Sequence, residues 1–246
     1  MNAQSVPIFG VRIDLAGYGN ILDAIAAAIA ARQRLTITGP HYSILLQARA
    51  DGALRAFLND CAINHPDGAG IALAIRYLHG IRAVRVNGTD LYEQLLRRFP
   101  PGDVRYFFLG GDEGTATALR NRFAVTGDDA AVHAHHGLDA IDDPAAATEI
   151  AAVFPDVLLV GMGSPKQFHW MARWQGELDV PVIIAVGGGL EFLSGRKRRA
   201  PRCMRVLGLE WLHRLLLEPG RLWRRYVLGI PTFLLAVHRE KTLQAG

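Results

Sequence analysis

Cysteine is scarce in this sequence. Its 246 residues contain only Cys61 and Cys203, with no Cys-x-x-Cys pair and no Cys/His spacing of a zinc site. We therefore expect two unpaired thiols rather than a disulfide framework or a zinc centre. The N-terminal residues also lack the basic start and the long apolar run of a secretory signal, which favours a protein that stays in the cytoplasm.

Long apolar runs are missing as well. The most apolar stretch near the end, residues 226–237, is interrupted by Gly229 and Pro231 and is shorter than the ~20 residues that a membrane-spanning helix needs. The sequence therefore predicts no spanning helix. Trp211 and Trp223 nevertheless stand among arginines, and this combination suits the headgroup region of an anionic membrane surface.

The usual nucleotide-binding fingerprints are absent. The glycine-rich stretches GMGSPKQ (161–167) and GGGLEF (187–192) lack the GxGxxG spacing, and GGDEGTA (110–116) does not continue into a Lys-Ser/Thr pair. This disfavours a nicotinamide enzyme and a P-loop NTPase. There is also no Asp-x-Asp pair.

Acidic residues are depleted at one end of the chain. Residues 196–246 carry twelve Lys/Arg against three Asp/Glu, whereas residues 1–195 carry fifteen against twenty. A basic segment that follows a more acidic body suits contact with anionic phospholipid or with a phosphorylated ligand. We therefore predict a catalytic core over residues 1–195 and a basic appendage over residues 196–246.

Short apolar runs that end at glycine recur along the body. They cover residues 35–38, 104–109, 157–160 and 182–186, and helix-like sequence separates them, including a helix over residues 20–34 with Asn20 as its cap. Such runs are typical of strands buried on both faces of a parallel sheet. We predict an α/β fold, a Rossmann-like open and mainly parallel sheet with helices on both faces. Ligands of such sheets bind beyond the carboxyl ends of the strands, and we expect the four glycine turns to line this rim.

The segment Asn64-His65-Pro66-Asp67-Gly68 places a carboxylate in a sharp bend before a helix. This bend could direct Asp67 into a cleft near a helix N-terminus. Aspartate is also a favoured N-cap residue, so a purely structural capping role is the alternative.

Seven motifs in order carry a family resemblance. They are NHPDGAGIALAIRYLHG, RVNGTDLYEQLL, FFLGG, HHG, VGMGSPKQ, VGGGLEFLSGRKRRAP and GLEWLHRLLLEPGRLWRRY. Together, over roughly Val6 to Leu235, the chain resembles the WecG/TagA/CpsF family, glycosyltransferase family 26. The resemblance implies a metal-independent, inverting hexosyltransferase without a cofactor. It would move a sugar from a UDP-sugar to a polyprenyl-diphosphate-linked sugar, at the cytoplasmic face of the plasma membrane, in cell-wall or exopolysaccharide synthesis.

The resemblance also assigns roles to individual residues. Asp67 matches the family's proposed base, which removes the proton of the acceptor hydroxyl, and Thr38 matches its active-site threonine. An ordinary strand-end hydroxyl remains the alternative for Thr38. Arginines are natural substitutes for a metal at a diphosphate leaving group. Four arginines match family positions on the donor side: Arg85, Arg214, Arg221 and Arg224. We expect the rim of the donor site to be completed by Asn64, Gly110, Gly163, Pro165 and Gln167. A solvated or lipid-binding basic face is the alternative for the arginines.

Two departures from the family pattern leave the donor sugar open. Phe168 stands where the family usually has glutamate, and Pro40 with His41 where it usually has asparagine. N-acetylmannosamine, its uronic acid and glucose are the candidate donors. The HAHH cluster at residues 133–136 lacks the geometry of a metal site.

Other classes of function remain to be weighed. A non-catalytic membrane scaffold is the alternative function, because it would explain the basic end of the chain and its Trp/Leu pattern. A nucleic-acid-binding role is disfavoured by the acidic body and the lack of a recognisable module. The oligomeric state, including a homo-oligomer, is open.

Overall fold

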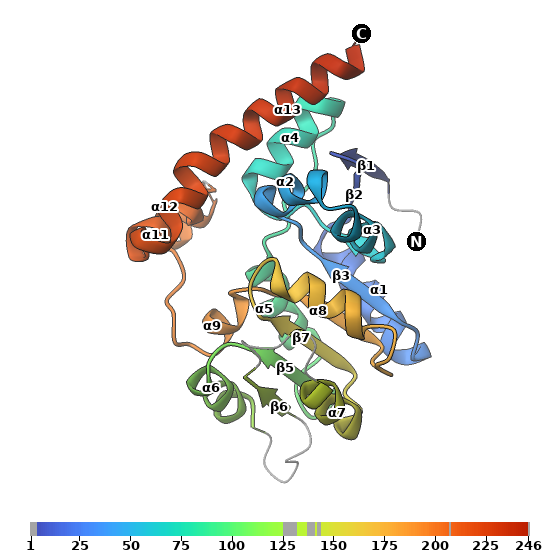
Figure 1. Cartoon of the computed structure of the whole chain (residues 1–246). Coiled ribbons are helices and arrows are strands. Elements are labelled where there is room, and N and C mark those ends of the chain that lie inside the picture. Colours follow the sequence, from blue (N-terminus) through green and yellow to red (C-terminus); the bar gives the residue numbers. More distant parts are fainter. Residues whose placement is uncertain (1–3, 125–131, 137–140, 142–143, 207, 246) are drawn as a thin grey trace.

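The computed structural model describes residues 4–124, 132–136, 141, 144–206 and 208–245 (Figure 1). Within these residues a six-stranded sheet has the order β4-β3-β8-β7-β5-β6, and all of its neighbouring strands are parallel. The strands are β3 (Leu35–Thr38), β4 (Ile63–Asn64), β5 (Tyr106–Gly110), β6 (Val132–His135), β7 (Val157–Gly161) and β8 (Val182–Ala185). The predicted class, an open parallel α/β sheet, is confirmed.

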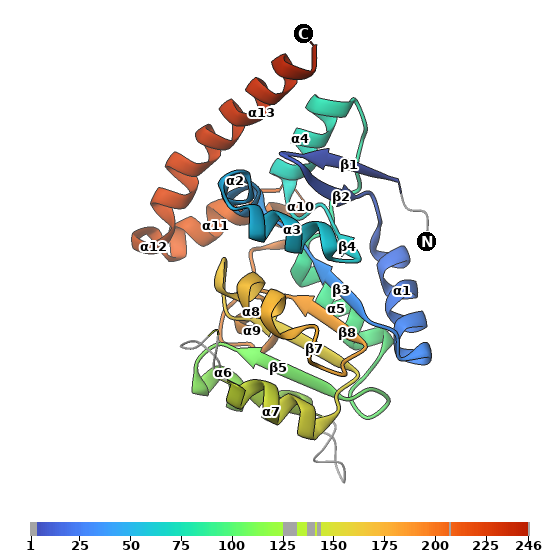
Figure 2. The same ribbon diagram turned by 45° about the vertical axis from the view of Figure 1, so that its right-hand side comes forward.

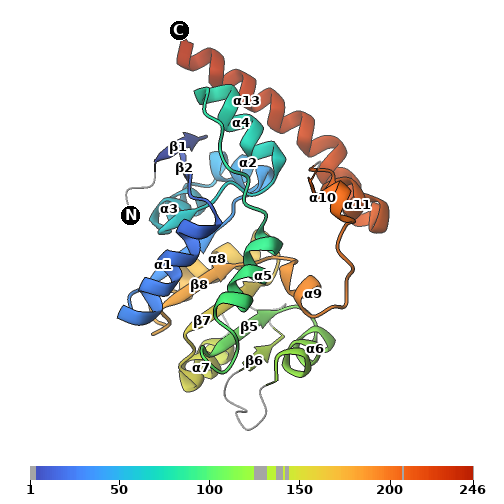
Figure 3. The same ribbon diagram turned by 180° about the vertical axis from the view of Figure 1, so that it is seen from behind.

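Helices cover both faces of this sheet. In β5, Tyr106 and Phe108 join one hydrophobic core, whereas Phe107 and Leu109 join the other, because successive side chains of a strand point to opposite faces. One face carries α1 (Tyr18–Ala31), α5 (Gly88–Arg98), α6 (Glu113–Phe123) and α9 (Gly189–Leu193); α1 and α5 lie in front in Figure 3. The other core includes side chains of α2 (Tyr42–Ala50), α3 (Gly52–Asp60), α4 (Ala69–His79), α7 (Pro144–Val153) and α8 (Lys166–Trp174).

The predicted strands match β3, β5, β7 and β8 within two residues at each end. The predicted cap of the first helix was wrong. The N-cap of α1 is Gly17, and Asn20 lies one turn inside the helix, where its Oδ1 accepts a hydrogen bond from the Gly17 N–H at 3.3 Å. The helix begins earlier because Asn20 reaches back to the cap residue instead of being it.

A hairpin, β1 (Ser5–Ile8) and β2 (Val11–Asp14), precedes the sheet. Its two turn residues, Phe9 and Gly10, have φ values of 53° and 76°. Such a conformation suits glycine but is uncommon for phenylalanine. The Phe9 ring is buried and packs edge-on against Phe233, with ring centroids 5.8 Å apart, so packing compensates for the backbone conformation.

The C-terminal segment, residues 196–245, contains α10 (Arg202–Val206), α11 (Glu210–Leu217), α12 (Pro219–Trp223), the π-helical turn η1 (Arg224–Leu228) and α13 (Gly229–Ala245). Its last helix runs beside α4 (Figures 1 and 2). There Glu240 accepts a hydrogen bond from the Phe9 N–H at 3.2 Å, and Lys241 Nζ donates to the Leu78 carbonyl at 2.7 Å. None of the described helices combines the length and the apolar character needed to cross a membrane.

Candidate active site

A pocket of about 720 Å³ opens at the carboxyl ends of the strands. The glycine turns that follow the strands form much of its wall: Gly39 after β3, Gly111 after β5, Gly161 and Gly163 at the end of β7, and Gly187 to Gly189 after β8. This arrangement confirms the prediction that the turns line one rim of the sheet. Helices α11, η1 and α13 close the pocket from the other side.

Gly110 supports this rim from beneath. It ends β5 with a φ of 123°, and a Cβ at this position would lie 2.5 Å from the carbonyl of Gly161 in β7. Gly110 itself does not line the pocket, whereas Gly111 does. The lack of a side chain therefore lets the ends of β5 and β7 approach closely.

Replacing Gly110 with alanine is expected to lower the free energy of unfolding by about 1–3 kcal/mol, because the methyl group meets main-chain atoms that can move little. Denaturant titration followed by circular dichroism measures this loss. Gly176→Ala is the matched control, since no atom lies within 4 Å of the added Cβ. Equal stability of the two variants would contradict this role of Gly110.

Asp67 lines the pocket and is partly buried. It does not cap α4, whose N-cap is Gly68 without a side-chain hydrogen bond. Instead its Oδ1 accepts from the Gly88 N–H, the first residue of α5, at 3.4 Å. Burial raises the pKa of Asp67 to about 6, and the charge of Glu210 acts in the same direction, while the Gly88 N–H, Arg214 and Arg225 oppose the rise. A carboxylate with this pKa is suited to accept a proton near neutral pH.

Thr38 and Asn64 meet at the ends of the paired strands β3 and β4. Both are fully buried, and the Thr38 hydroxyl donates to Asn64 Oδ1. Asn64 in turn donates from Nδ2 to the Leu58 carbonyl at 2.6 Å, and its N–H donates to Asp14 Oδ2 at 2.7 Å. Neither residue lines the pocket. The structure therefore brings the two together as a polar support next to Gly39, rather than at the pocket surface.

Only some of the arginines that were predicted to face the donor lie at the pocket. Arg85 and Arg214 line the pocket, and a Cβ on Gly188 in the rim would lie 3.0 Å from Arg214 Nη2. Arg224 is exposed, its guanidinium lies 5.5 Å from the ring centre of Trp223, and it does not line the pocket. Its neighbour Arg225 does line the pocket. The side chain of Arg221 lies outside the described part of the chain.

The remaining predicted rim residues surround the loop after β7. Gly163 and Gln167 line the pocket, while Pro165, between them, does not. Gln167 Oε1 accepts from the Gly187 N–H at 2.9 Å, so this side chain joins the loops that follow β7 and β8. Its amide nitrogen is the donor that it can offer to a ligand.

Sequence reasoning missed three other pocket residues. Tyr92 donates from its hydroxyl to the Ala185 carbonyl at 3.0 Å, and Glu210 accepts from Asn87 Nδ2 at 2.7 Å. His41, noted in the sequence only as a departure, interacts through Nε2 with the Ser164 hydroxyl at 3.3 Å. Burial lowers the pKa of His41 well below its usual range, and Arg225 and Arg214 lower it further, so the imidazole is neutral. Glu210 stands within the GLEWLHRLL motif, which was the available signal for it.

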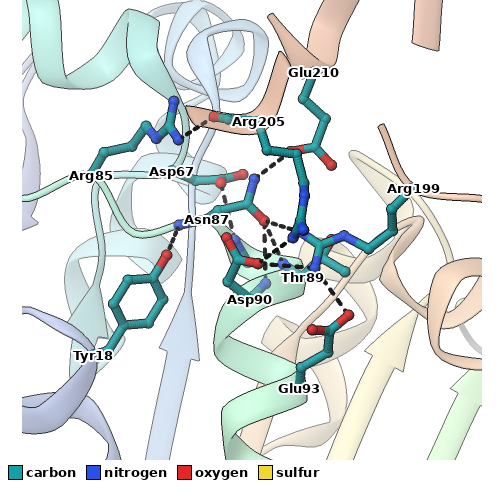
Figure 4. Close-up of polar contacts among 11 residues, drawn as sticks. Tyr18, Asp67, Arg85, Asn87, Thr89, Asp90, Glu93, Arg199, Arg205 and Glu210 are labelled. Carbon is teal, nitrogen blue, oxygen red and sulfur yellow. Dashed lines mark hydrogen bonds and ion pairs between the residues drawn. The ribbon is translucent and has the colours of Figure 1, made fainter. Parts of the chain in front are cut away.

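Ion pairs hold the C-terminal segment against the start of α5 (Figure 4). Asp90 accepts from Arg199 at 2.9 Å and from Arg205 at 3.1 Å, and Glu93 accepts from Arg199 at 2.9 Å. Arg85 donates to the Arg205 carbonyl at 2.7 Å. These contacts place α11 over the pocket.

No group of three or more His, Cys, Asp or Glu side chains suited to a metal ion occurs in the described part of the chain. Within the cluster at residues 133–136, His135 Nδ1 lies 2.7 Å from Glu149 Oε2. The expected independence from metal stays a prediction.

Comparison with known proteins identifies relatives of this chain. The family model described as "Glycosyl transferase WecG/TagA/CpsF family" matches residues 6–245. Curated relatives from the Staphylococcus aureus strains NCTC 8325 / PS 47, COL and MSSA476 are each 27% identical over 242 residues, which cover 98% of this chain and 94% of theirs. Each is named N-acetylglucosaminyldiphosphoundecaprenol N-acetyl-beta-D-mannosaminyltransferase.

Proposed function

Because this chain belongs to the WecG/TagA/CpsF family of glycosyl transferases, we propose that it transfers a sugar from a UDP-sugar to a polyprenyl-diphosphate-linked sugar with inversion at the anomeric carbon. The observation that carries this proposal is Asp67, which has a raised pKa and lines the same pocket as Arg214 and Arg225. The acceptor class follows from the name of the Staphylococcus aureus relatives.

The proposed reaction is a single displacement. The acceptor hydroxyl attacks the anomeric carbon of the donor as its proton passes to the Asp67 carboxylate. The new glycosidic bond forms on the face opposite the bond that breaks, and UDP leaves with the electron pair of that bond. Thr38 and Asn64 support this site from beneath, through their buried hydrogen bonds at the ends of β3 and β4.

The departing diphosphate develops negative charge that must be stabilised. Arg214 and Arg225 are the described cations that reach the pocket from the C-terminal segment, and Arg85 reaches it from the loop before α5. Guanidinium groups keep their charge at any working pH and match phosphate oxygens geometrically. The C-terminal segment therefore completes the donor site in this mechanism.

Of the two departures from the family pattern, His41 rather than Phe168 is placed to affect the choice of donor sugar. Phe168 is almost fully buried and packs near Phe57, with ring centroids 6.5 Å apart, so it does not face the pocket. His41 does line the pocket, as a neutral imidazole. N-acetylmannosamine, its uronic acid and glucose stay as the candidate donors.

The C-terminal segment also offers a surface for an anionic membrane. Leu216 and Leu217 of α11 are 71% and 61% exposed, and Trp223 is 43% exposed beside Arg224. Exposed apolar side chains and arginines on short helices suit the lipid headgroup region. We propose that residues 1–195 act as the catalytic core, and that residues 196–246 bind the cytoplasmic face of the plasma membrane and complete the site.

The decisive test offers the protein a panel of UDP-sugars and a short-chain prenyl-diphosphate sugar, with a chelator present. Release of UDP together with a lengthened acceptor is the expected result, and the panel identifies the donor. Transfer that needs added divalent metal would contradict the arginine mechanism. Vesicle binding without transfer from any donor would favour the membrane scaffold instead.

A further inference from the structure

The start of α5 holds two carboxylates that come from distant parts of the chain (Figure 4). Asn87 donates from Nδ2 to Oε2 of Glu210 at 2.7 Å, and the next residue, Gly88, donates its N–H to Oδ1 of Asp67 at 3.4 Å. Both carboxylates line the pocket. Asp67 follows β4, whereas Glu210 opens α11, so the pair exists only where the C-terminal segment docks.

Asn87 is fixed in the orientation that this pairing needs. Its Oδ1 accepts from the Thr89 and Asp90 N–H groups at 3.0 and 3.3 Å and thereby caps α5. Its own N–H donates to the Tyr18 hydroxyl at 2.8 Å. Because the oxygen is used by the cap, the Nδ2 group is the one that faces Glu210.

Contacts of the C-terminal segment with the rest of the protein fix the position of Glu210, the second carboxylate of the pair. Arg205 precedes Glu210 by five residues and is held by Asp90 through its side chain and by Arg85 through its carbonyl. The two anchors belong to the same region as Asn87, at the start of α5 and just before it. These contacts within the protein place the Glu210 carboxylate next to Asn87, and no substrate takes part in them.

We propose that Glu210 is a positioning residue for the general base, which couples docking of the C-terminal segment to the basicity of Asp67. This inference rests on the proposed function. A negative charge beside a carboxylate favours its protonated form and so makes it a stronger base. The same segment supplies Arg214 and Arg225 for the diphosphate, so its docking assembles the base and the leaving-group site together.

The surroundings of Asp67 support this reading. Burial is the largest cause of its raised pKa, and Glu210 is the negative charge that adds to it. Arg214 and Arg225 and the Gly88 N–H act in the opposite direction. Among the other titratable groups near Asp67, Arg85 is a cation that lines the same pocket. His65, Tyr18 and Tyr92 are neutral at working pH, because burial lowers the pKa of His65 to about 4 and raises that of the two tyrosines.

The test is the pH dependence of kcat/KM in Glu210→Gln. Glutamine keeps an oxygen for Asn87 Nδ2 but removes the charge. We expect the acid limb of the profile to move to lower pH, and kcat/KM on the plateau to fall about three- to tenfold, because a weaker base accepts the proton less readily. A loss that is equal at every pH, with an unmoved limb, would overturn the proposal.

Glu218→Gln is the matched control. It removes the same charge from the same segment, but Glu218 accepts from Lys197 at 2.7 Å and does not line the pocket. Its acid limb is expected to coincide with that of the unchanged protein. An equal displacement in both variants would show a general effect of net charge and would overturn the role of Glu210.

A second readout needs no transfer reaction. Carbon-13 NMR of protein labelled at the aspartate carboxyl carbons follows the titration of Asp67, whose signal is assigned by its loss in Asp67→Asn. The midpoint is expected near 6 in the unchanged protein and lower in Glu210→Gln. An unchanged midpoint would overturn the inference. A lowered midpoint in a protein that transfers no sugar would support the pairing and reject the proposed function.

Discussion

Asp67→Asn is expected to lower kcat by roughly 10²- to 10⁴-fold, the contribution of a positioned general base. Asparagine has nearly the same shape and can still accept a hydrogen bond from the Gly88 N–H, but it cannot take up a proton at working pH. The measurement is product formation at saturating donor and acceptor. Binding of both substrates is expected to change far less than kcat.

The pH profile gives a second view of the same residue. Asp67 must be ionised to accept a proton, and its pKa is raised to about 6, so turnover of the unchanged protein should fall as the pH drops through 6. For an ordinary aspartate the fall would begin about two units lower. Asp67→Asn should lose this acid limb from its residual activity.

Two controls show whether lost activity in Asp67→Asn results from the missing base or from a disturbed fold. Asp67→Asn should bind anionic vesicles and unfold at the same temperature as the unchanged protein. Asp103→Asn, which neutralises an exposed carboxylate, should turn over normally. Full activity of Asp67→Asn would reject Asp67 as the base.

Arg225→Ala is expected to lower kcat by about a hundredfold, as the loss of a group that stabilises developing charge does in other enzymes. Arg225 lines the pocket from η1, and the Tyr42 hydroxyl donates to its carbonyl, so its main chain is held in place. The measurement is single-turnover transfer with both substrates bound.

Arg224→Ala is the natural comparison, because the adjacent arginine is exposed and lies over Trp223 outside the pocket. We expect its turnover to fall far less and its binding to anionic vesicles to weaken. The reverse pattern, a large loss in Arg224→Ala and a small one in Arg225→Ala, would contradict the orientation of η1. Deleting the whole segment is a less specific test, since α13 also buries Phe233 against Phe9 and Tyr42.

Much of the sheet was predictable because its signals are local. The apolar runs at residues 35–38, 157–160 and 182–186 are each bounded by glycine, and such a pattern is typical of buried parallel strands. The hairpin was not predictable in the same way. Its turn places a phenylalanine at positive φ, and this is tolerated because Phe233, more than 200 residues away, packs against the Phe9 ring.

The structure brings some of the predicted site residues to the pocket surface but not others. Asp67 and Gln167 line the pocket, whereas Thr38 and Asn64 bond to each other below it. Strand ends at one rim can be identified from sequence, but whether a side chain at that end faces the cavity or its neighbouring strand depends on the pairing of β3 with β4.

By itself, the sequence determined the parallel α/β sheet, the glycine rim, the acidic bend at Asp67 and the basic end of the chain. Each of these is encoded by neighbouring residues. The tertiary structure alone decided that Arg225 rather than Arg224 enters the pocket, and that Glu210 meets Asn87 beside the base. The π-helical spacing of η1 alters the direction of successive side chains, and contacts between residues more than 100 positions apart depend on how the whole chain packs.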